Sequence, residues 1–304
     1  MPSQHETEVG LGQAMFGHAE LGDRRRTARL VSTFDQMCRH PGGSLPDKLS
    51  SPADLKALYR LCECEKVSHA ALIASMRQHT LGQIARHQGS VLVVHDATEL
   101  DYTSMKSLAE ELGQIGTGGG RGYICQNILA ISADTGHVLG LIDQILHCRD
   151  EVPEKETLAE HRARETRESL LWIKGTAHLP ADARLIDVAD QGSDTFEFLE
   201  HESNSGRRFV VRAHKARKLS LGHEPTKTKC SMKMKECAAK LPELGRFTLD
   251  IQAQRGRVAR KEAEFILRGG AVLVYPPHAR YGNHGREPLP LYLVRVSEGT
   301  PPGG

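Results

Sequence analysis

Two aspartates each follow an apolar run that is typical of a buried strand. Asp96 comes two residues after the run VLVV at 91–94, and Asp190 closes the run RLIDVAD at 184–190. In open α/β sheets, ligands gather at the carboxyl ends of the strands. Carboxylate oxygens are the ligands that Mg²⁺ prefers, and paired divalent ions steady the attacking and leaving oxygens in phosphodiester chemistry. The two residues therefore make a candidate metal site, although an Asp at a strand end also commonly caps the following turn.

Four other acidic residues compete for this role, and each has a simpler expected place. Asp187 stands three residues before Asp190, so strand alternation turns the two to opposite faces. Asp194 is expected to be the N-cap of a following helix. Glu99 and Asp101 are expected in a solvated loop just past the first strand.

Positive charge is concentrated in two places, although the whole chain carries a formal net charge of only +2. The segment 207–235 contains ten basic residues against one acid, Glu224. These ten are Arg207, Arg208, Arg212, Lys215, Arg217, Lys218, Lys227, Lys229, Lys233 and Lys235. The second group, at the start of a predicted helix, is Arg24, Arg25, Arg26 and Arg29. Cations are unfavourable at a helix N-terminus, so helix stability does not explain the second group. A phosphate backbone explains both concentrations of positive charge better than a solvated surface does.

Other sequence features exclude several classes of protein. The glycine-rich run 116–122 lacks the Lys-Ser/Thr pair and precedes a strand, so it is not a nucleotide-binding loop. The seven cysteines include no CxxC pair, which favours reduced thiols and argues against a structural metal. The polar, acidic start and the lack of a long apolar stretch predict a cytoplasmic protein that contacts no membrane.

The order of patterns predicts three regions. Residues 1–90 are predicted to be all helical, with helices near 24–38, 52–65 and 69–87. Residues 91–218 alternate apolar strands with helices, including a hairpin that turns at 134–136, a charged helix over 154–175 and a strand within 207–213. Residues 219–304 have short β-like runs separated by Gly, Pro and basic residues. The predicted fold class is therefore α/β, of a mixed α+β kind.

An ordered series of motifs points to one family. The stretches FGHAELGDRRRTARLV, LKALYRL, VLVVHDATELDYT, LIDVADQGSD and RRFVVRAHKARK occur here in that order, with the glycine-rich loop ending RGY between the third and fourth. The series resembles the bacterial cut-and-paste DDE transposases of the insertion-sequence-four family. This resemblance implies a helical DNA-binding domain at 1–90, a ribonuclease-H-like core at 91–218, and a β-rich insertion at 219–304.

The resemblance also implies roles for individual residues. The family uses three acidic residues to hold Mg²⁺, or Mn²⁺, for DNA cleavage and strand transfer, and Asp96 and Asp190 match the first two. The expected partner is double-stranded DNA at transposon ends. The residues expected to contact it are Arg24, Arg25, Arg26 and Arg29 in the N-terminal helix, and Arg212, Lys215, Arg217 and Lys218 beside the active site.

The third acid of the family has no clear match in this sequence. It belongs to a helical Tyr-x-x-Arg-x-x-x-Glu pattern, whereas Tyr292, Arg295 and Glu298 have the wrong spacing and lie in a run that is typical of a strand. We therefore expect a core truncated at its C-terminus and inactive alone. The alternatives are a DNA-binding inhibitor that pairs with a full-length transposase, a non-functional remnant, or a stand-alone nuclease that uses Glu298 or Glu287.

Overall fold

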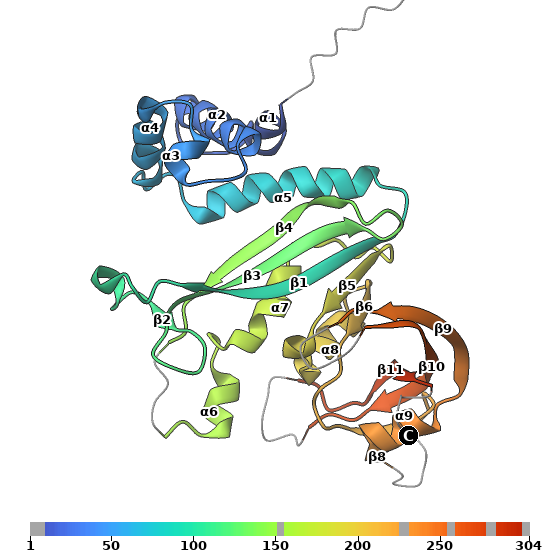
Figure 1. Cartoon of the computed structure of the whole chain (residues 1–304). Coiled ribbons are helices and arrows are strands. Elements are labelled where there is room, and N and C mark those ends of the chain that lie inside the picture. The colour runs from blue at the N-terminus through green and yellow to red at the C-terminus, as the bar shows by residue number, and fades with distance from the viewer. Residues whose placement is uncertain (1–9, 151–154, 225–230, 254–258, 278–283, 300–304) are drawn as a thin grey trace, which may run out of the picture. The chain divides into compact units, whose positions relative to one another are not determined.

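A computed structural model describes residues 10–150, 155–224, 231–253, 259–277 and 284–299 of the chain (Figure 1). The described residues form two compact units. Unit 1 lies within 1–152, 168–190 and 206–211, and unit 2 lies within 153–167, 191–205 and 212–304. By this division the N-terminal helices belong to the same unit as the first sheet. The described residues form helices and two sheets, which confirms the predicted mixed α/β class.

The first part of unit 1 is helical, as the sequence predicted. Its helices are α1 (Leu11–Phe16), α2 (Arg24–Arg39), α3 (Leu45–Lys48), α4 (Pro52–Cys62) and α5 (His69–Arg86). The N-cap side chains of Asp23, Ser51 and Ser68 accept hydrogen bonds from backbone amides in the first turns of α2, α4 and α5. Phe16 and Leu21 form a small buried core against apolar residues of α2 and α5.

The sheet of unit 1 contains β1 (Val91–Asp101), β2 (Gly113–Gln114), β3 (Arg121–Ser132), β4 (Val138–His147), β5 (Leu185–Ala189) and β6 (Arg208–Val211). β3 lies between β1 and β4 and is antiparallel to both, while β1, β5 and β6 run parallel in that order. The predicted β3–β4 hairpin and the predicted strands at β5 and β6 are confirmed. The helix α5 runs along β4 (Figure 1), and its Ile84 joins a core with Val91, Ile128 and Leu185.

Two predicted elements differ from the structure. The first strand continues well past its apolar run, because β3 pairs with β1 as far as Asp101. The single charged helix predicted over 154–175 is instead broken into α6 (Leu158–Ala163), the 3-10 turn Glu168–Leu170, and α7 (Leu171–Thr176). The chain leaves α6 at Arg164, whose backbone is extended.

Unit 2 is built around an antiparallel sheet and so confirms the predicted β-rich character of the C-terminal region. Its strands are β7 (Lys218–Leu221), β8 (Met232–Lys233), β9 (Glu243–Ile251), β10 (Arg260–Val274) and β11 (Leu289–Glu298), in the order β11-β10-β7-β8 with β9 also on β10. Its helices include α6, α8 (Phe196–Ser203) and α9 (Met234–Lys240). Leu219, Leu241 and Val272 are buried in its core.

Within the described residues, no helix is long and apolar enough to cross a membrane.

Candidate nucleic-acid interface and carboxylate pair

The parallel pairing of β1 and β5 brings the two predicted metal ligands together. The last pair in this ladder is His95 with Ala189; Asp96 is the next residue of β1, and Asp190 directly follows the last residue of β5. Neighbouring strands lie about 5 Å apart, and directly opposite residues point to the same face of a sheet. Both aspartates are exposed. Asp96 lies in the middle of β1 and not at its end, because β3 alone continues the pairing beyond the β1–β5 ladder.

These two residues offer hard oxygen donors from adjacent backbone positions. Mg²⁺ usually keeps several waters and is bound by one or two protein carboxylates, so this donor set fits Mg²⁺. Among the described residues there is no group of three or more His, Cys, Asp or Glu side chains that could hold a metal ion. The six cysteines that the structure describes are free, and Cys230 lies outside the described residues.

The opposite face of the same strands holds a buried polar network that the sequence did not reveal. The Nε2 atom of His95 lies 2.8 Å from Oδ1 of Asp187, and Nε of Arg207 donates to Oδ2 of Asp187 at 2.7 Å. Burial alone would raise the pKa of the Asp187 carboxyl, but the hydrogen bonds and charges of His95 and Arg207 outweigh it and hold that pKa below its ordinary value. Alternation therefore separates Asp187 from Asp190 as predicted. The only sequence signal for His95 was its inward place in the alternation of β1.

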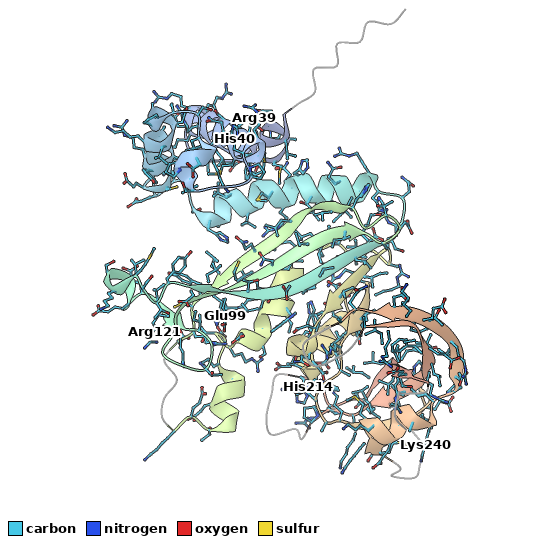
Figure 2. All side chains as sticks on the ribbon, viewed as in Figure 1. Arg39, His40, Glu99, Arg121, His214 and Lys240 are labelled. Carbon is cyan, nitrogen blue, oxygen red and sulfur yellow. The ribbon has the colours of Figure 1, made fainter. Side chains whose placement is uncertain are left out.

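Two of the other acids stabilise local structure in unit 1. Glu99 and Asp101 lie within β1, and not in the solvated loop that was expected. Glu99 accepts a hydrogen bond from the backbone N of Gly116 at 2.7 Å, in the turn between β2 and β3. Arg121, the first residue of β3, lies near Glu99 (Figure 2). Asp101 accepts from the amide and hydroxyl of Thr103, which lower its pKa.

The remaining acids belong to unit 2. Asp194 is not the N-cap of α8, because the neighbouring Thr195 makes the cap bond. Glu298 is the last residue of β11, so the run that contains it is a strand, as predicted. Its side chain forms an ion pair with Arg260. Glu287 is exposed just before that strand.

The four arginines of α2 have different surroundings. Arg24 and Arg25 are exposed at the first turn, and Arg25 pairs with the N-cap Asp23 at 2.9 Å. That side-chain pairing and the hydrogen bond from the Arg25 amide lower the pKa of Asp23 to about 2. The other two hold the helical segment together: Arg26 donates to the carbonyl of Leu21, and Arg29 pairs with Asp54 of α4 at 2.8 Å.

The second basic segment is also divided between exposed and buried residues. Arg212, Lys215 and Lys218 are exposed, and Lys218 lies directly opposite Lys233 in the β7–β8 ladder. Arg207 belongs to the buried network of unit 1, while Lys227 and Lys229 lie outside the described residues.

Arg217 differs from the exposed DNA contact that the sequence suggested. Only 11% of its side chain is exposed, and it forms an ion pair with Asp194, whose side chain is 2% exposed. Burial lowers the pKa of the Arg217 guanidinium. The other carboxylate oxygen of Asp194 accepts from the backbone amides of His214 and Lys215, both at 2.6 Å. Asp194 and Arg217 therefore fix the loop that carries the exposed Arg212 and Lys215. The exposed His214 of this loop is labelled in Figure 2.

Comparison with known proteins identifies the helical segment. Residues 12–67 match the family model described as transposase DNA-binding. The matched range contains α2, α3 and α4 and all four arginines of α2. The match supports a transposase-family role in DNA binding, with DNA as the partner.

Proposed function

We propose that this protein uses its N-terminal helical segment to bind double-stranded DNA at transposon ends. The observation that carries the proposal is the overlap between the transposase DNA-binding match at 12–67 and the exposed arginines that begin α2. Arg24 and Arg25 would contact phosphates, while Arg26 and Arg29 would hold the helix that presents them. Because an arginine at a helix N-terminus opposes the helix dipole, the pair at 24 and 25 favours a bound polyanion over folding stability alone.

We propose a second role for the sheet of unit 1, as a ribonuclease-H-like core. The order β4-β3-β1-β5-β6, with antiparallel β3 and parallel β1, β5 and β6, supports this proposal. Asp96 and Asp190 would hold Mg²⁺ or Mn²⁺, which would supply charge stabilisation at a scissile phosphodiester. The exposed Arg212, Lys215 and Lys218 would bind the DNA backbone.

The two carboxylates are one fewer than the three acids of the family that this sequence resembles. We therefore propose that the chain alone binds DNA without completing strand transfer. An inhibitor that occupies transposon ends, or pairs with a full-length transposase, would behave in the same way. Binding to end sequences without cleavage would agree with both of these roles, whereas cleavage that requires Asp96 would favour a nuclease.

The first experiment measures DNA affinity by fluorescence anisotropy over a range of salt concentrations. The probes are duplexes from the DNA flanking the coding sequence and scrambled duplexes of equal length. In the variant Arg24→Ala/Arg25→Ala we expect weaker binding and a salt slope reduced by nearly two, since each lost phosphate contact removes roughly 0.9 from the slope.

Arg39 provides the matched control. It is an exposed arginine at the other end of α2 (Figure 2), roughly 22 Å away at 1.5 Å per residue. The Arg39→Ala variant should bind like the parent protein. An unchanged slope in the double variant, or an equal loss in Arg39→Ala, would contradict the proposed DNA-binding surface.

A further inference from the structure

We propose that His95, Asp187 and Arg207 form a positioning network that sets the spacing and register of the strands that carry Asp96 and Asp190. The inference rests on the proposed metal role of those two aspartates. It assigns no contact with the metal or with DNA to the network itself. Its members would act through the backbone positions of their neighbours.

The network joins three consecutive strands immediately below the carboxylate pair. His95 is the last β1 residue paired with β5, Asp187 is central in β5, and Arg207 directly precedes β6. The side chains of His95 and Asp187 are fully buried, and that of Arg207 is 4% exposed. Each oxygen of Asp187 has a different partner, at 2.8 Å and 2.7 Å. One carboxylate therefore ties β5 to both of its neighbours.

Helix α7 covers this network within unit 1. At Gly175, an added Cβ atom would lie 2.8 Å from a side-chain carbon of Ile128 and 3.7 Å from Nδ1 of His95. The absence of a side chain lets the helix backbone approach the sheet closely at this point. Such close packing excludes water. Without water, an oxygen of Asp187 that lost its hydrogen-bond partner would be costly in free energy.

A buried ionic network of this kind contributes little to stability compared with apolar residues of similar size, because its desolvation is costly. Its hydrogen bonds do, however, form only when the strands are in one register. If β5 slipped by one residue along β1, every side chain of β5 would turn to the other face. Asp187 would then lose His95, and Asp190 would leave the face of Asp96. The contacts of Asp187 are thus satisfied only in the register that places the two exposed carboxylates together.

A second ion pair in the same unit offers a matched control. Arg77 of α5 pairs with Asp143 of β4 at 2.7 Å, with side-chain exposures of 19% and 8%. β4 is separated from β1 by β3. Breaking this pair should disturb the fold to a similar degree without moving β1 relative to β5.

The test compares Asp187→Asn with Asp143→Asn in the full chain, using Mn²⁺ alone as the probe. The free Mn²⁺ concentration is followed by electron paramagnetic resonance, and folding is followed by the fluorescence of Trp172, the single tryptophan, which is buried in α7. We expect Mn²⁺ to bind Asp187→Asn at least roughly tenfold more weakly, and Asp143→Asn within about twofold of the parent, by analogy with supporting residues around metal ligands. Equal affinity in the two variants would overturn the proposal.

Loss of folding in Asp187→Asn is handled by a second variant. In His95→Leu/Asp187→Leu/Arg207→Met, the three polar or charged side chains of the network are replaced together by apolar ones, so the sheet should fold. The register would then lack its directional contacts, and Mn²⁺ binding should again be weakened. Parent-like Mn²⁺ affinity in this folded variant would contradict a positioning role.

A measurement without metal separates this inference from the proposed function. In Asp96→Cys/Asp190→Cys, the register of the β1–β5 ladder predicts two Cα atoms within the range that a disulfide can bridge, and the cross-linked peptide is quantified by mass spectrometry after mild oxidation. Adding Asp187→Asn should lower the cross-linked fraction severalfold, while adding Asp143→Asn should not. If the parent binds no Mn²⁺ through Asp96 and Asp190, the metal role fails and the cross-link alone decides the positioning role. An unchanged cross-linked fraction would refute it.

Discussion

Replacing Asp194 by Ala should destabilise the loop of unit 2 that presents Arg212 and Lys215. The carboxylate of Asp194 pairs with the buried guanidinium of Arg217 and accepts hydrogen bonds from two backbone amides. Without it, the positive charge of Arg217 remains buried with no compensating anion. The amides of the exposed residues 214 and 215 can instead bond to water.

The magnitude follows from the burial of this pair. Its side chains are 2% and 11% exposed, so solvent screens the charges little. Breaking a buried ion pair by removing one partner costs about 3–5 kcal/mol. The pair of Asp182 and Arg184 is the control, because its side chains are 25% and 39% exposed and such a pair contributes about 0–1 kcal/mol.

Hydrogen exchange of the peptide spanning 212–221 is the suitable assay, since the single tryptophan lies in unit 1 and does not report on this loop. We expect the free energy of opening for this peptide to fall by about 3–5 kcal/mol in Asp194→Ala, and the DNA affinity to fall with it. The double variant Asp194→Ala/Arg217→Ala should lose less than the sum of the single losses, because it leaves no unpaired charge. Additive losses, or an Asp194→Ala effect on its peptide as small as the effect of Asp182→Ala on a peptide spanning 180–190, would refute the assigned role.

Two further predictions concern unit 1. The carboxyl of Asp23 should titrate by NMR with a pKa of about 2, and Arg25→Ala should move it toward 3.8. Since its folded pKa is lowered, the stabilisation of α2 by this cap is complete above pH 3.8 and is lost as the pH falls through about 2; a midpoint near 3.8 in the parent would contradict the pairing. Gly122→Ala should lower the free energy of unfolding, measured by chemical denaturation, by about 1–3 kcal/mol, because its Cβ would lie 1.9 Å from the carbonyl oxygen of Leu100. At Gly118 the added Cβ meets nothing within 4 Å, so Gly118→Ala should change stability by less than about 0.5 kcal/mol, and similar losses at both sites would argue against a close approach at Gly122.

Local sequence patterns predicted most of the helices and strands and where most of them begin. The N-cap residues Asp23 and Ser68 marked the starts of α2 and α5, and Asp134-Thr135-Gly136 marked the turn between β3 and β4. These features depend on neighbours within a few residues, so spacing and residue type were sufficient to predict them. The transposase-type DNA-binding segment was also predicted from sequence, through an ordered series of motifs, and the match at 12–67 supports it.

Which charged residues are exposed and which are buried depends on the tertiary structure. Arg207 and Arg217 belong to the same basic segment as Arg212 and Lys215, but each is held by an aspartate distant in sequence. The pairing of β1 with β3 carried β1 through Asp101, and the pairing of β1 with β5 brought Asp96 beside Asp190. Such contacts join residues up to about a hundred positions apart, and periodicity within one segment carries no information about the register between two segments.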